Sequence, residues 1–535
     1  MPSRHHVLIT DGIHQAAVDI LQPHCEVTVK NKLSADELTG LLGSLSGMMV
    51  RSATRVTDET IAHAPGLKII GRAGVGTDNI DLKAATRHGI IVVNSPGGNT
   101  EAAAEHTIGM IFALARRIPV ADKAVKAGGW RDKSMTGVEL RGKTLGIVGF
   151  GKIGRRVARV FQRVGMTVLV HDPFLSESVA QELNVTPVEL AELYAQSDFI
   201  TLHAPKLPET EKMLNTEAFA QMKDGVRLVN CARGSLIDET ALAEAIGAGK
   251  VAGAALDVFD SEPPALDTPL FTYSDQLITT PHLGASTEEA QINVAVDIAE
   301  QFIEFFEKGT AQNAVNIPAL RYEFIEPVKA YLPMAEVLGN FIRQLSSSGA
   351  VQLELTAHGD YAQHNLQPVL LAALKGFLSH AREGVNYVNA LLVAEEEGIA
   401  VKESRAPKSS KNLYTNLLTL TLTTDKAAYS VSGSVLSDEM FRIVEVNGYP
   451  ANLEASRYLL LCPHTDQPGM VGQIANILGQ HHINISAMDV ARQGQAAGGE
   501  SIMIFNLDDP VGEAVLEQIK TVGGVLRAKF IELPV

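Results

Sequence analysis

The sequence predicts an α/β chain that begins with two doubly wound domains and continues with α+β segments. Three observations support this fold class. Short apolar runs alternate with helix-like segments over about the first 300 residues, which is typical of open parallel sheets. A glycine-rich turn follows one of these runs at residues 149–154. Residues 457–535 carry a βαββαβ pattern, the order of a ferredoxin-like unit.

Length and composition indicate a large globular protein. The chain has 535 residues, enough for three or four domains, and 46% of them are apolar against 20% charged. The net charge of −16 argues against a general nucleic-acid binder, because such proteins need many cations to neutralise phosphates. The charge is uneven: residues 51–163 carry a local balance of +10, whereas residues 251–300 contain no Lys or Arg. This pattern indicates either scattered surface charge or an anion site supplied by the first segment.

The first 143 residues predict one parallel sheet followed by a long helix. Strands are expected at four apolar runs, 6–10, 47–50, 67–72 and 89–94. Helices are expected at 14–22, 81–89 and 101–117, the last with basic residues in its final turn. Residues 128–143 are rich in polar residues and glycine, and we expect a loop there.

A second series of strands starts at residue 144. Its expected strands are 144–150, 167–172, 198–205, 225–234, 252–259 and 276–285. A helix pattern covers 286–308.

The segment 321–455 mixes helix and strand patterns. Strands joined by turns are expected at 415–425 and 441–453, and a polar turn at 402–412. The final βαββαβ unit is expected to comprise, in order, 457–464, 468–482, 484–493, 500–508, 511–522 and 525–533.

The motif GFGKIG predicts a dinucleotide site of the Rossmann type. Gly149 permits the tight turn, Gly151 lets the backbone approach a pyrophosphate, and Gly154 lets the helix pack on the strand. The next expected strand ends at Asp172, whose carboxylate can accept hydrogen bonds from both ribose hydroxyls and repels a 2′-phosphate. We therefore expect NAD rather than NADP as cofactor, the alternative being a purely structural glycine turn.

Three polar groups follow successive strands of the second series. They are Arg233, Glu262 and His282, and strand carboxyl ends are where open α/β sheets bind ligands. A guanidinium can hold a carboxylate through two parallel bonds. A neutral imidazole can remove a hydroxyl proton, and a carboxylate behind it orients the ring. These three residues therefore indicate a dehydrogenase acting on a 2-hydroxy acid. The alternative for each is an ordinary surface or turn residue.

Five motifs resemble those of the D-2-hydroxyacid dehydrogenases. They are GRAGVGTDNID (71–81), GFGKIG (149–154), NCARGSLIDE (230–239), ALDVFDSEPP (255–264) and PHLGAST (281–287). The resemblance implies that Arg233 binds the substrate carboxylate, that His282 is the acid/base and that Glu262 is its partner. It also implies that Cys231, Asp257 and the backbone of Lys152 and Ile153 line the NAD site.

A second set of residues indicates a phosphorylated substrate. Arg51 and Ser52 follow one expected strand and Arg72 ends the next, so the three converge on one sheet edge. These three residues resemble the ligands that hold the substrate phosphate in family members that act on 3-phosphoglycerate. The amides of residues 72–76, Gly74 among them, are implied to contact the substrate carboxylate. Arg55, nearby, is equally well explained as a solvated turn residue.

Trp130 and Arg131 lie in the expected polar loop. A lone tryptophan in a loop is usually a packing residue, but this one has Arg131 and Lys133 beside it. In the family, the corresponding loop reaches across a dimer to the partner's substrate. The resemblance therefore implies substrate contacts by Trp130 and Arg131 between subunits.

The segment HTDQPGMVGQIANIL (464–478) carries a D-x-P-G turn before the first helix of the C-terminal unit. With this motif and its βαββαβ order, the unit resembles the ACT domain, a small-molecule sensor. In relatives that are regulated by serine, the positions of Asp466 and Asn484 hold the effector between paired domains, the alternative being a module that only joins subunits. The resemblance implies a homo-oligomer, for which we expect a tetramer. It further implies a substrate-binding domain at 1–98 and 290–317, an NAD-binding Rossmann domain at 99–289, an intervening domain at 318–455 and the ACT domain at 456–535.

The intervening segment contains four cations in the expected turn, namely Lys402, Arg405, Lys408 and Lys411. They indicate either a second anion site or a solvated turn. Cys25, Cys231 and Cys462 are too far apart in sequence to suggest a zinc site or a disulfide framework, and we expect no metal. No segment resembles a signal peptide or a membrane span, and we expect a cytoplasmic protein.

Together with these features, the resemblance implies the NAD-dependent oxidation of 3-phosphoglycerate to 3-phosphohydroxypyruvate, the first step of serine synthesis, with feedback regulation by serine. One alternative is another enzyme of the same family, acting on 2-oxoglutarate, glycerate or a different phosphorylated acid. The other is a non-catalytic NAD-sensing protein, similar to the family's transcriptional corepressors.

Overall fold

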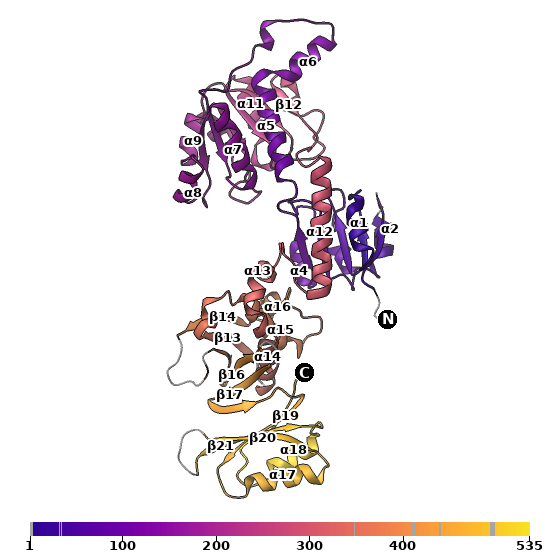
Figure 1. Cartoon of the computed structure of the whole chain (residues 1–535), viewed down its shortest axis with the longest axis vertical. Helices are drawn as coiled ribbons and strands as arrows, with labels where there is room; N and C mark the ends of the chain where they lie inside the picture. Colours follow the sequence, from indigo (N-terminus) through magenta and orange to yellow (C-terminus); the bar gives the residue numbers. More distant parts are fainter. Residues whose placement is uncertain are drawn as a thin grey trace.

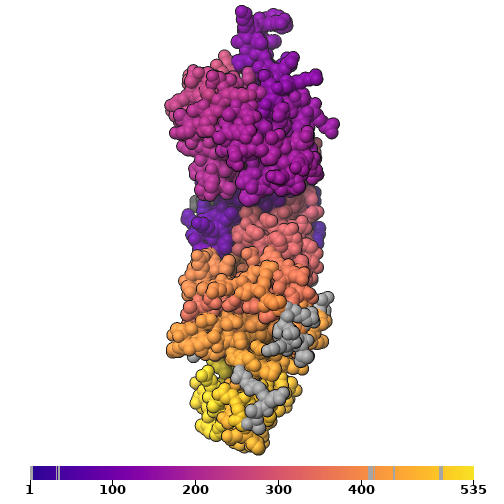
Figure 2. Space-filling view, turned by 90° about the vertical axis from the view of Figure 1, so that its left-hand side faces the viewer, coloured from indigo at the N-terminus to yellow at the C-terminus, as the bar shows by residue number. Residues whose placement is uncertain are grey.

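The computed structural model describes residues 4–31, 33, 35–346, 348–407, 414, 416–437, 440–492 and 498–534. Four β-sheets follow one another along an elongated molecule (Figure 1). The sheet that contains the glycine turn lies at one end and the C-terminal sheet at the other, as the colour bands of Figure 2 also show. The N-terminal sheet lies between the glycine-turn sheet and the rest of the chain.

The N-terminal sheet has five parallel strands in the order β2-β1-β3-β4-β5. Its strands are β1 (His6–Ile9), β2 (Glu26–Val29), β3 (Gly47–Val50), β4 (Ile69–Arg72) and β5 (Ile91–Asn94). Its helices are α1 (Gln15–Leu21), α2 (Ala35–Leu42), α3 (Asp58–Ala62) and α4 (Leu82–Arg87). The four strands and two helices expected between residues 6 and 94 are confirmed.

A helix from much later in the chain packs on this first sheet. The helix α12 (Glu288–Lys308) places the fully buried Phe302 ring against the strand backbones. A Cβ atom at Gly47 would lie 2.7 Å from this ring, and one at Gly71 would lie 2.5 Å from it. Glycine at both positions therefore allows the close approach of α12, whose other end leads to the His282 loop.

The second sheet has seven parallel strands in the order β12-β11-β10-β9-β6-β7-β8. This order is the doubly wound Rossmann arrangement with one additional strand. The strands are β6 (Thr144–Val148), β7 (Thr167–His171), β8 (Thr186–Pro187), β9 (Phe199–Leu202), β10 (Val226–Asn230), β11 (Val251–Leu256) and β12 (Leu277–Thr279). The helices are α5 (Thr100–Arg116), α6 (Ile118–Lys126), α7 (Lys152–Val164), α8 (Glu177–Glu182), α9 (Leu190–Gln196), α10 (Thr216–Gln221) and α11 (Glu239–Gly247).

The helix α6 has no counterpart among the expected elements. Arg117 adopts a left-handed φ of 53° and ends α5, and α6 begins directly after it with Pro119 in its first turn. Proline is tolerated there because the first amides of a helix have no intrahelical acceptor.

The third sheet has the order β14-β13-β15-β16-β17-β18. Its strands are β13 (Ala350–His358), β14 (Ala400–Ala406), β15 (Leu417–Thr424), β16 (Ala428–Ser437), β17 (Met440–Val446) and β18 (Tyr449–Leu453). Its helices are α13 (Tyr322–Ile325), α14 (Leu332–Leu345), α15 (Gln367–Ser379) and α16 (Ala390–Glu396).

The prediction of a polar turn at 402–412 is wrong for the first half of that segment. Residues 402–406 belong to β14, which pairs in parallel with β13 at the edge of the sheet. An edge strand tolerates charged side chains such as Lys402 and Arg405, because it can turn them toward water. Lys408 and Lys411 lie outside the described residues.

The fourth sheet has the order β20-β21-β19-β22 and is entirely antiparallel. Its elements are β19 (Tyr458–Thr465), α17 (Met470–Gln480), β20 (Ile485–Arg492), β21 (Glu500–Leu507), α18 (Glu513–Lys520) and β22 (Lys529–Glu532). The predicted βαββαβ unit is confirmed, except that its turn at 493–497 lies outside the described residues. Leu459 and Ile504 of this sheet share one hydrophobic cluster with Leu418 of the third sheet.

Cys25, Cys231 and Cys462 are free thiols, the first and last of them buried. Within the described ranges, none of the helices combines the length and the apolar character that a membrane crossing requires.

Candidate active site

The glycine turn has the geometry of a pyrophosphate cradle. Gly149 has a left-handed φ of 90°, and a Cβ there would lie 2.6 Å from the backbone of His203. A Cβ at Gly154 would lie 2.4 Å from the Gly149 carbonyl oxygen, so this glycine permits the helix to pack on the strand. A Cβ at Gly151 would meet open space, so this glycine leaves room above the N-terminus of α7. A helix N-terminus with free amides attracts an anion at this point.

Asp172 follows β7 and lies beside the same turn. Its Oδ2 accepts a hydrogen bond of 2.6 Å from the Phe150 amide, and its Oδ1 accepts one of 2.8 Å from the Phe174 amide. These two bonds fix the carboxylate next to the turn, where the ribose of a dinucleotide lies in this fold. The residues present therefore fit NAD.

Replacing Asp172 with alanine is expected to raise the dissociation constant of NAD about tenfold, because the two bonds to the ribose hydroxyls are lost. The preference for NAD over NADP is expected to shrink as well, since the repulsion of a 2′-phosphate disappears. Titration calorimetry with both nucleotides measures both effects. The exposed Glu182 at the end of α8, changed to alanine, is the matched control. Unchanged NAD affinity in the Asp172 variant would contradict the assignment.

A cationic pocket of about 330 Å³ lies beside the start of α7. Lys152, Arg155, Arg156 and Arg159 line it together with the acidic Glu101. Among the described residues, Glu101 forms its ion pair with Arg156, at 2.7 Å. Several of the cations that give residues 51–163 their local net charge of +10 therefore lie together beside the glycine turn. This favours the interpretation that the segment supplies an anion site.

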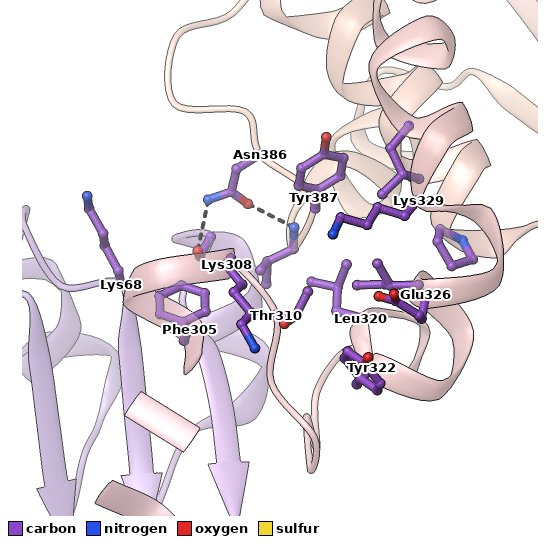
Figure 3. A pocket seen from close by; sticks show the side chains of 16 residues that line it. Lys68, Phe305, Lys308, Thr310, Leu320, Tyr322, Glu326, Lys329, Asn386 and Tyr387 are labelled. Atoms are coloured by element: carbon purple, nitrogen blue, oxygen red, sulfur yellow. Dashed lines mark hydrogen bonds between the residues drawn. The ribbon is translucent and has the colours of Figure 1, made fainter. Parts of the chain in front are cut away.

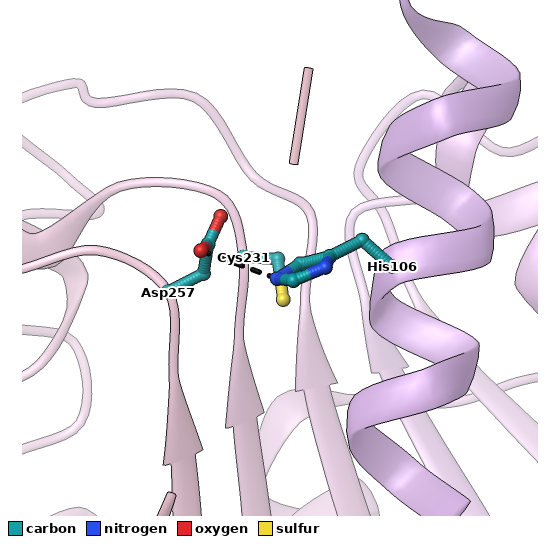
Figure 4. A group of neighbouring side chains, drawn as sticks. All are labelled: His106, Cys231 and Asp257. Atoms are coloured by element: carbon teal, nitrogen blue, oxygen red, sulfur yellow. Dashed lines mark ion pairs between the residues drawn. The ribbon is translucent and has the colours of Figure 1, made fainter. Parts of the chain in front are cut away.

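Asp257, Cys231 and His106 form a compact group at the ends of β11, β10 and in α5 (Figure 4). Asp257 is fully buried, and its Oδ1 lies 3.2 Å from His106 Nε2. Burial works to raise the pKa of Asp257, but hydrogen bonds from His106, Thr280 and the Leu283 amide outweigh it and hold the pKa below its usual range. Burial raises the pKa of the Cys231 thiol to about 12, so this thiol is protonated at neutral pH.

Asp257 also anchors the loop that carries His282. Its two carboxylate oxygens accept hydrogen bonds from the amides of Leu283 and Gly284, at 2.7 and 2.8 Å. Its backbone carbonyl accepts the His282 amide at 2.8 Å. His282 itself has a left-handed φ of 55°, which is uncommon for a residue with a side chain and is held by these bonds.

His282 and Glu262 form the predicted dyad. The Nδ1 atom of His282 lies 2.7 Å from Glu262 Oε2, and the Phe259 amide donates to Glu262 Oε1 at 3.2 Å. Glu262 therefore orients the ring and leaves Nε2 for a second partner. Both side chains are partly exposed, so a substrate can reach them.

Three guanidinium groups converge at the carboxyl edges of the two parallel sheets. Arg51 follows β3, Arg72 ends β4 and Arg233 follows β10. Burial, together with the nearby charges of Arg233 and Arg51, lowers the pKa of the Arg72 guanidinium to about 10. The buried Nε of Arg72 has no hydrogen-bond partner in the described structure. Like charges held together with an unpaired buried donor are the expected state of an anion site before its ligand binds.

Glycines let the backbone lie against these arginines. Gly74 has a left-handed φ of 148°, and a Cβ there would lie 1.5 Å from Arg72 Nη1. A Cβ at Gly76 would lie 2.0 Å from Arg233 Nη2. The segment 72–76 therefore passes directly over both side chains, where its amides can face the same ligand. Ser52 is exposed in the loop that follows β3.

Three further residues, which no sequence motif singled out, hold this site. Arg233 Nε donates to Asp78 Oδ2 at 3.2 Å. Asp11 accepts hydrogen bonds from the amides of Arg51 and Thr54, at 2.8 and 3.0 Å. The third is His106, described above. Asp11 directly follows the expected strand at 6–10, and Asp78 lies within the motif GRAGVGTDNID, so both stand beside predicted features. Their partners could not be identified from the sequence, because these partners are far away along the chain.

Trp130 and Arg131 do not join the arginine cluster of the same chain. Trp130 is 80% exposed, and it follows α6, which lies at the end of the second sheet remote from the first sheet (Figure 1). The packing role that a lone tryptophan usually has is therefore not seen within this subunit.

Asp466 and Asn484 do not meet within one chain. Asp466 follows β19 and pairs with Arg492 at 2.7 Å, whereas Asn484 precedes β20 and donates to Asp508 at 2.6 Å. Thr465 is paired with Glu500 at one end of β21, and Ile485 with Leu507 at the other. Seven residues of strand separate these ends, about 24 Å at 3.4 Å per residue.

Comparisons with known proteins identify the domain families to which the chain is similar. Residues 108–284 match the sequence model of the NAD-binding domain of the D-isomer-specific 2-hydroxyacid dehydrogenases. Residues 327–447 match the intervening domain of D-3-phosphoglycerate dehydrogenase, and residues 458–524 match the ACT domain. The predicted NAD cofactor and the predicted ACT domain are thereby confirmed at the level of the domain families.

Two relatives named D-3-phosphoglycerate dehydrogenase match almost end to end. The protein from Synechocystis is 46% identical over 98% of this chain and 94% of its own length. That from Archaeoglobus fulgidus is 40% identical over 98% of this chain and all of its own length.

Among solved structures, D-lactate dehydrogenase from Aquifex aeolicus, complexed with NAD and lactic acid, is similar with a TM-score of 0.51 and 32% identity. It covers 57% of this chain and 96% of its own. The apo-structure of D-lactate dehydrogenase from Escherichia coli has a TM-score of 0.51 and 30% identity over 58% of this chain and 99% of its own. This chain therefore belongs to the D-3-phosphoglycerate dehydrogenases, NAD-dependent oxidoreductases of the D-2-hydroxyacid dehydrogenase family.

Proposed function

We propose that the chain oxidises 3-phospho-D-glycerate to 3-phosphohydroxypyruvate with NAD. The observation that carries this proposal is the convergence of Arg51, Arg72 and Arg233, together with the buried Nε of Arg72, which has no hydrogen-bond partner among the described residues. A substrate with a phosphate at one end and a carboxylate at the other brings about three negative charges at neutral pH. Three guanidiniums match this charge and supply the bidentate geometry that both anions favour.

In this reaction His282 Nε2 takes the proton of the substrate hydroxyl, and Glu262 stabilises the imidazolium that forms. Arg233 and the amides of residues 72–76 hold the carboxylate, while Arg51, Ser52 and Arg72 hold the phosphate. When bound, NAD supplies the acceptor for the hydride that leaves the carbon bearing this hydroxyl. In the reverse direction the imidazolium of His282 returns its proton to the oxygen.

The test measures the formation of NADH by its absorbance, with 3-phosphoglycerate and a panel of unphosphorylated D-2-hydroxy acids as substrates. We expect kcat/KM for 3-phosphoglycerate to exceed that for D-glycerate about 10²-fold or more, because the phosphate adds several charge-assisted hydrogen bonds. Higher kcat/KM for 2-hydroxyglutarate or glycerate would favour another enzyme of the family. Absence of turnover with every acid, while NAD still binds, would favour the NAD-sensing alternative.

The division into domains is part of the proposal. We propose a substrate-binding domain of residues 1–98 and 290–317, an NAD-binding domain of 99–289, an intervening domain of 318–455 and an ACT domain of 456–535. The packing of α12 on the first sheet supports the discontinuous first domain. Free thiols are typical of a reducing compartment, and we propose the cytoplasm as the location.

We also propose that serine inhibits the enzyme by binding between two ACT domains. Asp466 offers a carboxylate for the ammonium of serine, and Asn484 offers an amide for either end. Because they lie at opposite ends of β21, one ligand can contact both only if they come from different subunits. Antiparallel pairing of two β20 strands is one arrangement that brings them together, and β20 is an edge strand with Met488 and Val490 exposed.

Replacing Asn484 with alanine is expected to raise the serine concentration for half-inhibition about tenfold or more, since two ligand hydrogen bonds are lost. The uninhibited rate of the same variant is the reference for each titration. Asn447, in the turn between β17 and β18, changed to alanine is a control of the same residue type. Serine inhibition that persists in the Asn484 variant would rule out this effector site.

The exposed loop at Trp130 and Arg131 supports a homo-oligomer, for which we propose a tetramer. We propose that this loop reaches the substrate of a partner subunit. Replacing Arg131 with alanine is then expected to raise KM for 3-phosphoglycerate about tenfold, because a charged contact to the phosphate is lost. Steady-state kinetics test this, and Lys123→Ala on the exposed face of α6 is the control. An unchanged KM would exclude the contact between subunits.

A further inference from the structure

A cavity of about 420 Å³ lies between the N-terminal sheet and the helices that precede the third sheet (Figure 3). One wall comes from the last turn of α12, where Phe305 and Lys308 lie, and from Lys68 and Gly89 of the N-terminal sheet's loops. The opposite wall comes from residues between 320 and 388. Its volume is in the range of pockets that hold small organic molecules. No residue of the proposed active site lines it.

The floor of the cavity is apolar. It is formed by Phe305, Leu320, Ile325, Leu332, Pro368 and Val388. Leu320, Ile325 and Val388 are buried, so these side chains form the inner surface and not a solvated rim. An apolar ligand body that covers this floor removes apolar surface from water, and this favours binding.

The rim of the cavity is positively charged. Lys68, Lys308 and Lys329 line it, opposed by the single carboxylate of Glu326. Within the part of the chain that the structure describes, none of these three ammonium groups has an acidic partner within 4.0 Å. The nearby Lys375 differs in this respect, because its ammonium pairs with Glu336 at 2.7 Å. The rim therefore holds cations that are free to pair with a ligand carboxylate.

The wall around Tyr387 is held in place without a ligand. Asn386 Nδ2 donates to the Gly89 carbonyl at 2.9 Å, and its Oδ1 accepts the Val388 amide at 2.9 Å (Figure 3). A Cβ at Gly89 would lie 2.3 Å from this amide group. Tyr387 donates its hydroxyl to Glu336 at 3.1 Å, and the Lys375 ammonium lies 4.9 Å from its ring centre. A wall fixed in this way lowers the conformational cost of binding.

We propose that this cavity binds a small monocarboxylic acid with an aromatic or branched aliphatic body. The body lies on the apolar floor, and the carboxylate pairs with the ammonium groups of Lys308 and Lys329. Phosphorylated three-carbon acids do not match, because they have no apolar body to cover the floor. The site is separate from the catalytic one and does not depend on the proposed function.

The test uses 3-phenylpropionate as probe and titration calorimetry on the full chain. We expect saturable binding to one site for each chain, with affinity at least about tenfold above that of the neutral 3-phenylpropanamide. The double variant Lys308→Gln with Lys329→Gln is expected to lower the affinity for the acid about tenfold and to leave the amide unaffected. Lys123→Gln on α6 is the matched control and is expected to bind as the parent chain does. Absence of saturable binding, or equal binding of acid and amide, overturns the proposal.

A second measurement locates the site without a variant. Lysine acetylation followed by mass spectrometry is expected to be slowed several-fold at Lys308 and Lys329 by saturating 3-phenylpropionate, while Lys123 reacts at its usual rate. Leu332→Trp, which fills the cavity from α14, is expected to abolish this protection. Binding that protects neither lysine, or that survives in a folded Leu332→Trp chain, places the acid elsewhere and overturns the proposal. NADH formation enters neither measurement, so failure of the proposed function leaves this test intact.

Discussion

Replacing His282 with alanine is expected to lower kcat for NADH formation from 3-phosphoglycerate about 10³-fold. Glu262 holds Nδ1 of the ring at 2.7 Å, so Nε2 is the group available to take the hydroxyl proton. General-base catalysis of this kind contributes about 10²–10⁴-fold to a rate. Steady-state kinetics give kcat, and titration calorimetry shows whether NAD still binds with the parent affinity.

The Glu262→Gln variant is the matched comparison for this experiment. Glutamine retains the size of the side chain and one hydrogen bond to Nδ1 but removes the charge that stabilises the imidazolium. We expect a loss of about 10- to 100-fold in kcat, intermediate between the parent and the His282 variant. Normal NADH formation by the His282→Ala chain would contradict the catalytic assignment and return the NAD-sensing alternative to consideration.

Replacing Arg72 with glutamine is expected to lower kcat/KM for 3-phosphoglycerate about 10²-fold or more. The guanidinium lies partly buried beside Arg51 and Arg233, and its Nε has no hydrogen-bond partner among the described residues. Loss of charge-assisted hydrogen bonds to the phosphate costs about 1.5–3 kcal/mol for each bond. For D-glycerate, which lacks the phosphate, we expect a much smaller loss. Arg55→Gln is the control, because Arg55 is exposed and lines a different pocket.

The same residue predicts a pH dependence. Since the pKa of Arg72 is lowered to about 10, its guanidinium is charged at neutral pH and loses its proton as the pH rises through about 10. The affinity for the phosphorylated acid is therefore expected to fall as the pH rises through that value, and to stay high below it. Titration calorimetry with 3-phosphoglycerate between pH 7 and pH 10.5 measures this fall. If the affinity of the Arg72→Gln chain falls equally over this pH range, the group that titrates is not Arg72.

Much of the fold could be predicted because its signals are local. Buried parallel strands are short apolar runs, and the turn at Gly149 and Gly154 requires glycine for steric reasons that act within a few residues. The residues at strand ends could be predicted for the same reason, since parallel strands place their carboxyl ends along one edge. Arg72, Arg233 and His282 were identified in this way.

Other features could not be predicted because the groups that explain them are distant in sequence. Asp78 and Arg233 are 155 residues apart, and Asp11 and Arg51 are 40 apart. Residues 402–406 have the composition of a turn, yet backbone pairing with β13 makes them a strand.

The amino-acid sequence alone predicts the parallel sheets and the NAD turn, and it identifies the residues proposed as the acid/base pair and as phosphate ligands, because each depends on side-chain chemistry at short spacing. Three-dimensional packing adds the anchoring of the His282 loop by Asp257, the unpaired donor of Arg72 and the separation of Asp466 from Asn484. It also creates the cavity at Lys308 and Lys329, whose walls come from residues up to about 320 positions apart. These features arise from burial and long-range contact, which composition and spacing do not encode.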